Sequence, residues 1–336
     1  MSNLNSNLKL NPDIFDADVE TKPIRDGYGP GLVAAGEANK NVVALSADLT
    51  ESTRTEAFAK QFPERFFEVG VAEQNLATIA AGLGVSGKIP FLASYATFSP
   101  GRNWEQIRTT IAYNDSNVKI AGHHAGLMTG PDGATHQALE DIALMRVLPN
   151  MKVFVPCDAF QAQRATEASA KLWGPVYLRF ARAASPLVTT ALTPFTPGKG
   201  QILWTPKGSK KPEVAIFACG VMVHEALLAA RLLEADDIHA TVVNIHTIKP
   251  LDTDLVSSLA EAAGAVVSAE EHQIMGGLGG AIAEALALSH PVPQEFVGVD
   301  DAFGASGSPH DLLEAYGLTA KHIVSAAKKV IKRKKK

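Results

Sequence analysis

The chain has few cysteines, the residues that build disulfide frameworks and thiolate metal sites. Its 336 residues include only two cysteines, Cys157 and Cys219. Two cysteines are too few for a disulfide framework, and they lack the CxxC spacing of a metal site. The sequence also contains no GxxxxGK[ST] and no HExxH motif, so it indicates neither a P-loop nor a zinc-protease site. We expect a reducing, cytoplasmic location.

Long hydrophobic runs and a strong excess of charge are also lacking. No apolar run reaches the roughly 20 residues of a membrane span, and the Asn- and Ser-rich residues 1–11 have no apolar core of a signal peptide. The formal net charge is only -4, so no overall field favours nucleic acid or an anionic membrane. The basic residues 331–336 are interpreted as a solvated helix end. We therefore expect no nucleic-acid and no membrane partner.

The pattern that is present predicts an α/β protein. Hydrophobic residues make up 46% and charged residues 20% of the chain, which is ordinary for a globular protein. Apolar strand-like runs alternate with helical patterns, which favours a mostly parallel sheet covered by helices on both faces. The expected strands are 41–45, 89–95, 118–122, 152–156 and 176–180, followed after residue 212 by EVAIFA, ATVVNI and AVVSAEE.

Changes in composition divide the chain into two α/β domains. Residues 1–22 are polar and aperiodic, and we interpret them as an N-terminal arm or a disordered start. The first domain is expected over residues 23–190. Residues 191–212 are rich in Pro, Gly, Ser and Lys, which is typical of a linker. The alternation of strands and helices then restarts, and a second, smaller domain is expected over residues 213–336.

The most informative stretch is GHHAGLMTGPDGATHQALED, residues 122–141. Its histidines can exchange a proton near neutral pH, and its glycines let the backbone approach a ligand closely. Such a loop is suited to surround a polar small molecule. The alternative is a solvent-exposed polar loop without a binding role.

A second candidate is Glu73, which opens a helical pattern at the end of the short run VGVA. A carboxylate at a helix start is stabilised by the helix dipole, and that explanation alone would suffice. Tyr95 and Phe98 add two aromatic rings at a strand end, where a flat heterocycle could stack. Together they favour a functional carboxylate that holds a proton against a ring nitrogen.

Six motifs in this order resemble the pyrimidine-binding and C-terminal domains of the transketolase family. The resemblance covers about residues 23–330, and its motifs are SADLTES (46–52), VGVAEQN (69–75), SYATF (94–98), HHAGLMTGPDGATHQALED (123–141), RVLPNMKVFVPCD (146–158) and YLRFAR (177–182). It implies that the first domain is a pyrimidine-binding fold for thiamine diphosphate. The smaller second domain is then a transketolase C-terminal domain.

Transketolases bind the cofactor diphosphate and its metal with an N-terminal domain that carries a GDG…N motif. No GDG occurs in these 336 residues. The resemblance therefore implies the C-terminal section of a split transketolase, whose partner is a separate N-terminal subunit. The implied cofactors are thiamine diphosphate and Mg²⁺ or Ca²⁺, with the metal ligated by the partner. The expected assembly is an α2β2 heterotetramer in which this chain also self-associates.

The resemblance also implies a role for each candidate residue. Glu73 matches the glutamate that hydrogen-bonds N1′ of the aminopyrimidine, while Tyr95 and Phe98 match rings that pack on it. Asp48 matches an acid near the thiazolium. The terminal phosphate of the sugar is bound at positions matched by Arg25, Ser52, His124 and Arg179. Asp132 and His136 match contacts to sugar hydroxyls, and His136 is also the candidate for proton transfer.

The resemblance implies two-carbon ketol transfer from a ketose phosphate to an aldose phosphate, as in the pentose phosphate pathway. The stretches HHAG and GRNWEQIR depart from many full-length transketolases, which leaves the sugar pair open. The alternatives are a 2-oxo acid dehydrogenase beta subunit, a 1-deoxyxylulose-5-phosphate synthase-like enzyme, and a non-catalytic scaffold. His246, Glu270, Glu271 and His272 are interpreted as interface or structural residues, and we expect the C-terminal domain to serve subunit contact.

Overall fold

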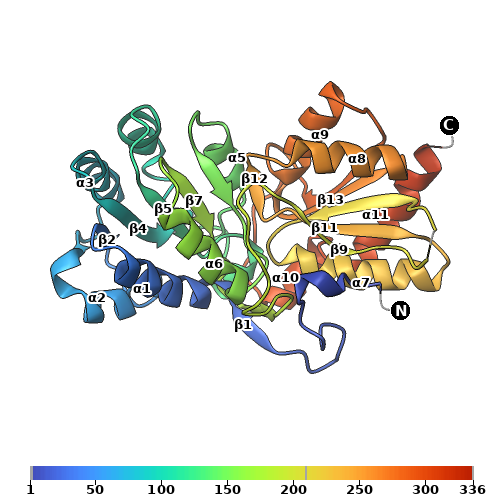
Figure 1. Cartoon of the computed structure of the whole chain (residues 1–336), viewed down its shortest axis with the longest axis horizontal. Helices are drawn as coiled ribbons and strands as arrows, with labels where there is room; N and C mark the ends of the chain where they lie inside the picture. The colour runs from blue at the N-terminus through green and yellow to red at the C-terminus, as the bar shows by residue number, and fades with distance from the viewer. Residues whose placement is uncertain (1–2, 209, 335–336) are drawn as a thin grey trace.

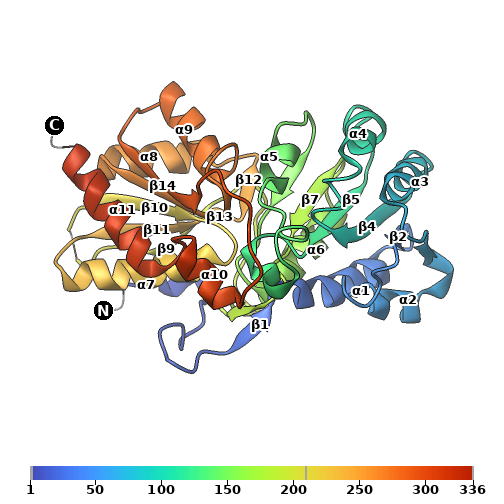
Figure 2. The same cartoon turned by 180° about the vertical axis from the view of Figure 1, so that it is seen from behind.

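The computed structural model describes residues 3–208 and 210–334 of the chain. Two α/β units lie side by side, and each is a sheet with helices on both faces (Figure 1). The α/β prediction is confirmed. The view from behind shows the C-terminal helix α11 (Ala320–Arg333) lying across the outer side of the second unit (Figure 2). Within the basic end 331–336, the helix includes residues up to Arg333, and residues 335–336 lie outside the described part.

The first unit is built on a seven-stranded sheet. All of its neighbouring strands are parallel except the pair formed by β12 and β6. The strand order is β12 (Thr247–Lys249), β6 (Lys152–Phe154), β7 (Val176–Arg179), β5 (Lys119–His123), β4 (Ile89–Tyr95), β2 (Val42–Ser46) and β3 (Phe66–Glu68). The expected strand 89–95 coincides with β4, and the others agree to within two residues.

Alternate residues of each strand enter two separate cores, because successive side chains of a strand point to opposite faces. In β2, Val42 and Ala44 belong to one core, and Val43 and Leu45 to the other. The first face is covered by α1 (Tyr28–Ala38), α2 (Glu56–Gln61) and α6 (Ala159–Ala170). The opposite face is covered by α3 (Glu73–Val85), α4 (Trp104–Gln106), the π-helix Ile107–Ala112 and α5 (Asp141–Arg146).

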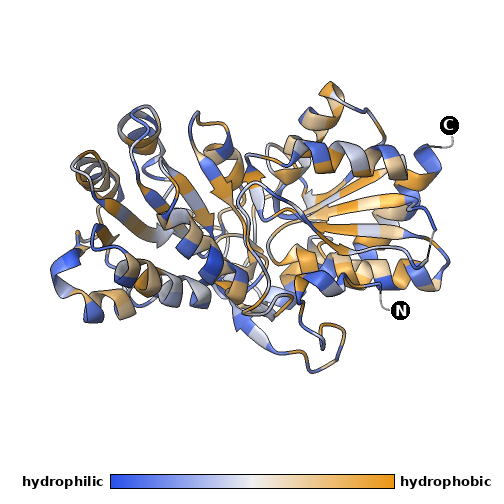
Figure 3. Cartoon of the chain, in the orientation of Figure 1, coloured by the Kyte–Doolittle hydropathy of each residue, from blue (hydrophilic) through white to orange (hydrophobic). Residues whose placement is uncertain are grey.

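The second unit repeats this three-layer plan around a five-stranded sheet. Its strand order is β14 (Gln294–Val299), β13 (Val266–Gln273), β10 (Val214–Ala218), β11 (Ala240–Asn244) and β9 (Gln201–Trp204). Helices α7 (Met222–Ala235) and α11 pack on one face, and α8 (Thr253–Ala263) and α9 (Leu278–Leu288) on the other. Apolar residues concentrate on the strands, whereas the outer helix faces are mixed (Figure 3).

The segment between the units is more than a simple linker, and two further elements join the units. Strand β9 lies within the expected linker 191–212 and pairs antiparallel with β11, so part of that segment belongs to the second sheet. Strand β12 follows the second unit's β11 but pairs with β6 of the first sheet. Helix α10 (Pro309–Ala315) packs on the 3₁₀ helix Leu127–Asp132 of the first unit.

Residues 3–22 form an arm rather than a disordered start. Leu4 bridges to Trp204, and Ile14 is fully buried. The arm ends at β1 (Thr21–Pro23), which pairs with β8 (Ala184–Pro186). Within residues 3–208 and 210–334, the structure contains no helix of the length and apolarity needed to cross a bilayer.

Candidate functional site

The candidate residues gather at the carboxyl edge of the first sheet. Asp48 follows β2, Tyr95 ends β4, His124 follows β5 and Arg182 follows β7. Because the sheet is parallel, these strands all end at one edge, which is where open α/β sheets bind ligands. Residues that follow different strands in the chain therefore lie close together at this edge.

Glu73 is the buried carboxylate of this edge. It begins α3 and is only 3% exposed. Nη1 of Arg102 donates to both Glu73 carboxylate oxygens at 2.8 Å, and Nδ2 of Asn103 donates to the Glu73 carbonyl at 2.8 Å. The Arg102 guanidinium also lies over the Phe98 ring, 4.6 Å from its centroid. Glu73 is therefore connected to the aromatic residues through Arg102.

An aromatic group lies between this carboxylate and the histidine loop, which we define as residues 123–141. The Tyr95 ring stacks on the His124 imidazole with centroids 3.7 Å apart and on Phe98 at 5.8 Å. His136 meets Phe98 edge-on at 5.4 Å and Tyr95 at 6.2 Å. Tyr95 and Phe98, which the resemblance assigns to the cofactor, thus contact His124 and His136, which it assigns to the sugar.

A cationic group adjoins His124. Nη1 of Arg25 donates to the Ser52 carbonyl at 2.9 Å and to Nε2 of His124 at 3.3 Å. Burial, followed by the charges of Arg25 and Arg182, lowers the pKa of His124 to about 3. Burial and then Arg54 lower the pKa of Arg25 as well. A neutral His124 beside several arginines is suited to hold an anion, because each arginine retains N–H groups for a phosphate.

The contacts of Arg179 in the structure argue against its assignment to the sugar phosphate. Arg179 is the last residue of β7, and its side chain is 3% exposed. Its Nε donates to Asp141 at 2.9 Å, and its Nη2 donates to the Glu271 carbonyl at 2.8 Å. Although burial alone would lower the pKa of Arg179, the carboxylates of Asp141 and Glu271 hold it above its usual value. The guanidinium is committed to this buried cluster.

Arg182, three residues further along the chain, was missed by the sequence analysis. Its Nη1 donates to the Thr129 carbonyl of the histidine loop at 2.9 Å, and its charge acts on both Arg25 and His124. Arg102 was also missed, although it lies in the GRNWEQIR stretch that departs from the family pattern. Its contact with Glu73 spans 29 residues of sequence, so spacing gave no signal for it.

Two predicted residues lie on exposed loops. Asp48 is exposed with a φ of 60°, and its N–H donates to Oε1 of Glu68 at 2.7 Å. Asp132 is exposed at the end of the 3₁₀ helix Leu127–Asp132. Within the part of the chain that the structure describes, no group of three or more His, Cys, Asp or Glu side chains is arranged to hold a metal ion.

The fold and the site define a class of protein: a two-unit α/β chain with a buried carboxylate, aromatic rings and an arginine group at one sheet edge. Comparison with known protein families identifies both units. Residues 20–186 match the model of the transketolase pyrimidine binding domain, and residues 205–323 match the transketolase C-terminal domain. The chain belongs to the transketolase family.

Individual relatives agree. A putative transketolase C-terminal section from Methanocaldococcus jannaschii is 42% identical, over 94% of this chain and 97% of its own length. A 6-deoxy-6-sulfo-D-fructose transketolase subunit from Clostridium sp. is 40% identical, over 95% and 98%. A solved structure described as a split gene transketolase, inactive beta4 tetramer, has a TM-score of 0.85 and 49% identity, over 93% of this chain and 99% of its own. Human transketolase is 33% identical, and this chain spans 49% of its length.

Proposed function

We propose that this chain is the C-terminal subunit of a split, thiamine diphosphate-dependent transketolase. The enzyme would move a two-carbon ketol unit from a ketose phosphate to an aldose phosphate. A separate N-terminal subunit would carry the diphosphate and metal site, with Mg²⁺ or Ca²⁺ as the metal, in an α2β2 heterotetramer. The observation that carries the proposal is the sheet edge where the buried Glu73 carboxylate, the aromatic residues and the Arg25–His124 pair lie together.

The residues present fit the aminopyrimidine half of the cofactor. A buried carboxylate suits a basic ring nitrogen, because a proton shared between them satisfies both groups away from water. Tyr95 and Phe98 offer ring faces for stacking, and Asp48 lies on the neighbouring loop after β2. Thiamine diphosphate, when bound, supplies the carbon that accepts and releases the two-carbon unit. Glu73 would hold the proton at N1′ of the pyrimidine.

The remaining residues would bind the sugar. Arg25 and Arg182 would hold the terminal phosphate, with the Ser52 loop and neutral His124 beside them. Asp132 would contact a sugar hydroxyl. His136, against the aromatic rings, would contact another hydroxyl and move its proton during carbon–carbon cleavage.

The domain limits and location are also proposals. We propose domains at residues 23–190 and 213–336, joined by 191–212. The family models matched to residues 20–186 and 205–323 support two domains, and β9 attaches part of 191–212 to the second sheet. A cytoplasmic location is supported by two cysteines that are free and buried.

The relatives named for sulfo-fructose and for apulose 4-phosphate indicate that sugar specificity varies within this group. We propose pentose phosphates as the sugars of this chain, and hence a role in the pentose phosphate pathway.

The test mixes this chain with the N-terminal subunit, thiamine diphosphate and Mg²⁺, and measures ketol transfer from xylulose 5-phosphate to ribose 5-phosphate. Transfer that requires both chains supports the proposal. Decarboxylation of a 2-oxo acid instead would favour a dehydrogenase beta subunit. No transfer with any phosphorylated or sulfonated sugar, in the presence of Mg²⁺ or Ca²⁺, would favour a scaffold.

A further inference from the structure

The histidine loop is held from its inner side by a carboxylate of the C-terminal domain. Glu271 lies near the end of β13, and its side chain is 1% exposed. Its Oε1 accepts a hydrogen bond from the Met128 N–H at 2.5 Å. The fit is close: a Cβ at Gly126, where φ is 81°, would lie 2.3 Å from the same carboxylate. Only glycine is compatible with this approach of loop and carboxylate.

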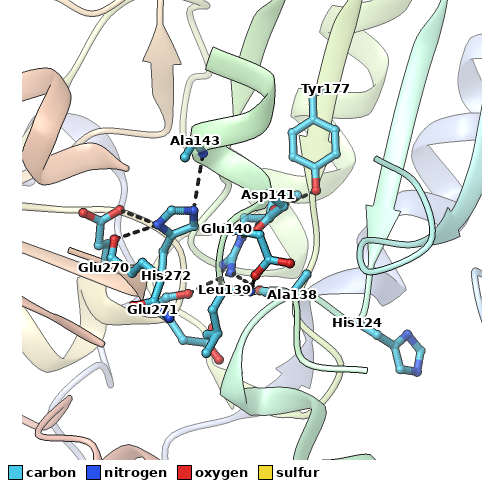
Figure 4. Close-up of polar contacts among 12 residues, drawn as sticks. His124, Ala138, Leu139, Glu140, Asp141, Ala143, Tyr177, Glu270, Glu271 and His272 are labelled. Carbon is cyan, nitrogen blue, oxygen red and sulfur yellow. Dashed lines mark hydrogen bonds and ion pairs between the residues drawn. The ribbon is translucent and has the colours of Figure 1, made fainter. Parts of the chain in front are cut away.

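Arg179 extends the contact to the far end of the loop. Its guanidinium donates to the carboxylate of Asp141, the last residue of the loop, and to the Glu271 carbonyl. Figure 4 shows Asp141, Tyr177 and Glu271 at this junction. Nη1 of Arg179 is 3.8 Å from Oε2 of Glu271. Tyr177 donates its hydroxyl to Asp141 at 2.7 Å. One buried cation thus ties the loop end to the strand that carries Glu271.

A second part of the C-terminal domain contacts the loop between these points. Nε2 of Gln137 donates to the Ala305 carbonyl at 2.9 Å and to the Gly130 carbonyl at 3.1 Å. A Cβ at Gly133 would lie 2.5 Å from Oγ of Ser306. The loop is therefore fixed at Met128, Gln137 and Asp141, and both Asp132 and His136 lie between fixed points.

We propose that Glu271 is a positioning residue through which the C-terminal domain holds the histidine loop in its substrate-binding geometry. The proposal rests on the proposed function and deepens it, because it gives the C-terminal domain a part in binding the sugar in addition to subunit contact. Charge-assisted hydrogen bonds to buried backbone N–H groups are the strong ones. Burial raises the pKa of Glu271 to about 7 and Arg179 opposes this shift, so the carboxylate carries its charge above about pH 7.

The matched control is another ion pair between the same two units. Arg146 on α5 contacts Glu284 on α9, with Nη2 and Oε2 2.5 Å apart, and Glu284 is 66% exposed. Glu284→Gln removes a carboxylate between the units without touching the histidine loop. Glu271→Gln keeps the shape of the side chain and removes its charge.

The first measurement is hydrogen–deuterium exchange of the full chain, which needs no activity. Glu271→Gln should accelerate exchange in the peptide containing Met128 by about tenfold or more, while Glu284→Gln leaves it unchanged. Equal exchange in wild type and Glu271→Gln overturns the proposal. If Glu271→Gln does not fold, Gln137→Ala tests the second fixed point in the same way.

The second measurement is steady-state kinetics of the complex with its N-terminal subunit. Glu271→Gln should raise KM for the sugar phosphate and lower kcat/KM about tenfold or more, with thiamine diphosphate affinity by calorimetry unchanged. An unchanged KM, or a loss of activity that follows only the folded fraction, overturns the proposal. Inactivity of the wild-type complex would instead count against the proposed function, and the exchange result would still decide the role of Glu271.

Discussion

Arg102 donates a single guanidinium nitrogen, Nη1, to both carboxylate oxygens of Glu73 while its charged plane lies over Phe98. These are the two contacts, a planar cation on the carboxylate and a stacked face on the ring, that we propose for the cofactor pyrimidine. Arg102 and the pyrimidine cannot both contact the Glu73 carboxylate and the Phe98 ring at the same time. Arg102, which is 50% exposed, is free to move toward solvent, whereas Glu73 is held in α3.

Arg102→Gln should therefore bind thiamine diphosphate more tightly in the complex with the N-terminal subunit. An ion pair with one exposed partner contributes up to about 1 kcal/mol, so the Kd should fall by no more than about fivefold. Titration calorimetry measures it, and Arg108→Gln, at an exposed position of the neighbouring π-helix, is the control. Weaker binding by Arg102→Gln would mean that Arg102 supports Glu73 in the bound complex.

Glu73→Ala should remove ketol transfer while preserving the fold. Positioned proton-transfer groups contribute about 10²–10⁴-fold to rate, so kcat should fall by at least about 100-fold. Circular dichroism and thermal melting check the fold. Transfer within tenfold of wild type would contradict the role of Glu73.

Arg182→Ala and Arg179→Ala should fail in different ways. Arg182→Ala should raise KM for phosphorylated sugars about tenfold or more with little change in stability, because it removes a charge-assisted contact at the sheet edge. Arg179→Ala leaves Asp141 and Glu271 buried without their cation, which should cost about 3–5 kcal/mol of unfolding free energy. Denaturant unfolding measures the stability loss, and steady-state kinetics measure the change in KM. If Arg179→Ala raised KM without loss of stability and Arg182→Ala did not raise KM, Arg179 would be the phosphate ligand.

The depressed pKa of His124 predicts a pH dependence of stability. Its folded pKa of about 3 lies below the ordinary value of 6.5, so between these values the unfolded chain binds the extra proton. Stability contributed by neutral His124 is present above pH 6.5 and is lost as pH falls toward 3, by at most about 1.4 kcal/mol per unit. The unfolding free energy of His124→Gln should therefore fall less than that of wild type between pH 7 and pH 5. Parallel curves from denaturant titrations would contradict this.

The sequence predicted those parts of the fold that depend on local pattern. Strand β4 coincides with its expected range, and α3 begins at Glu73 as expected, because apolar runs and helical periodicity are short-range signals. Strand β12 was not predicted. Its three residues are too few for a pattern, and their pairing with β6 depends on how the two units meet.

In the candidate site, too, the sequence predicted what depends on local motifs and not what depends on tertiary contacts. The motifs named Tyr95, Phe98, His124 and His136 as separate candidates, and the contacts between them are seen only in the folded chain. Arg179 and Arg182 are three residues apart in YLRFAR, and composition cannot tell which one ends the strand facing the second unit and which continues into the site. Burial decides this, since Arg179 is enclosed with Asp141 and Glu271, and burial is a property of the folded chain.

Strand β12 has one consequence for movement. β12 follows β11 of the second unit in the chain but pairs with β6 at the edge of the first sheet. From β12, Lys249 also donates to the Arg146 and Leu148 carbonyls of the first unit. The two units are therefore held together by these hydrogen bonds as well as by residues 191–212, and a hinge opening would have to break them. We expect access to the sheet edge to depend on side-chain and loop rearrangement, with both units moving as a single body.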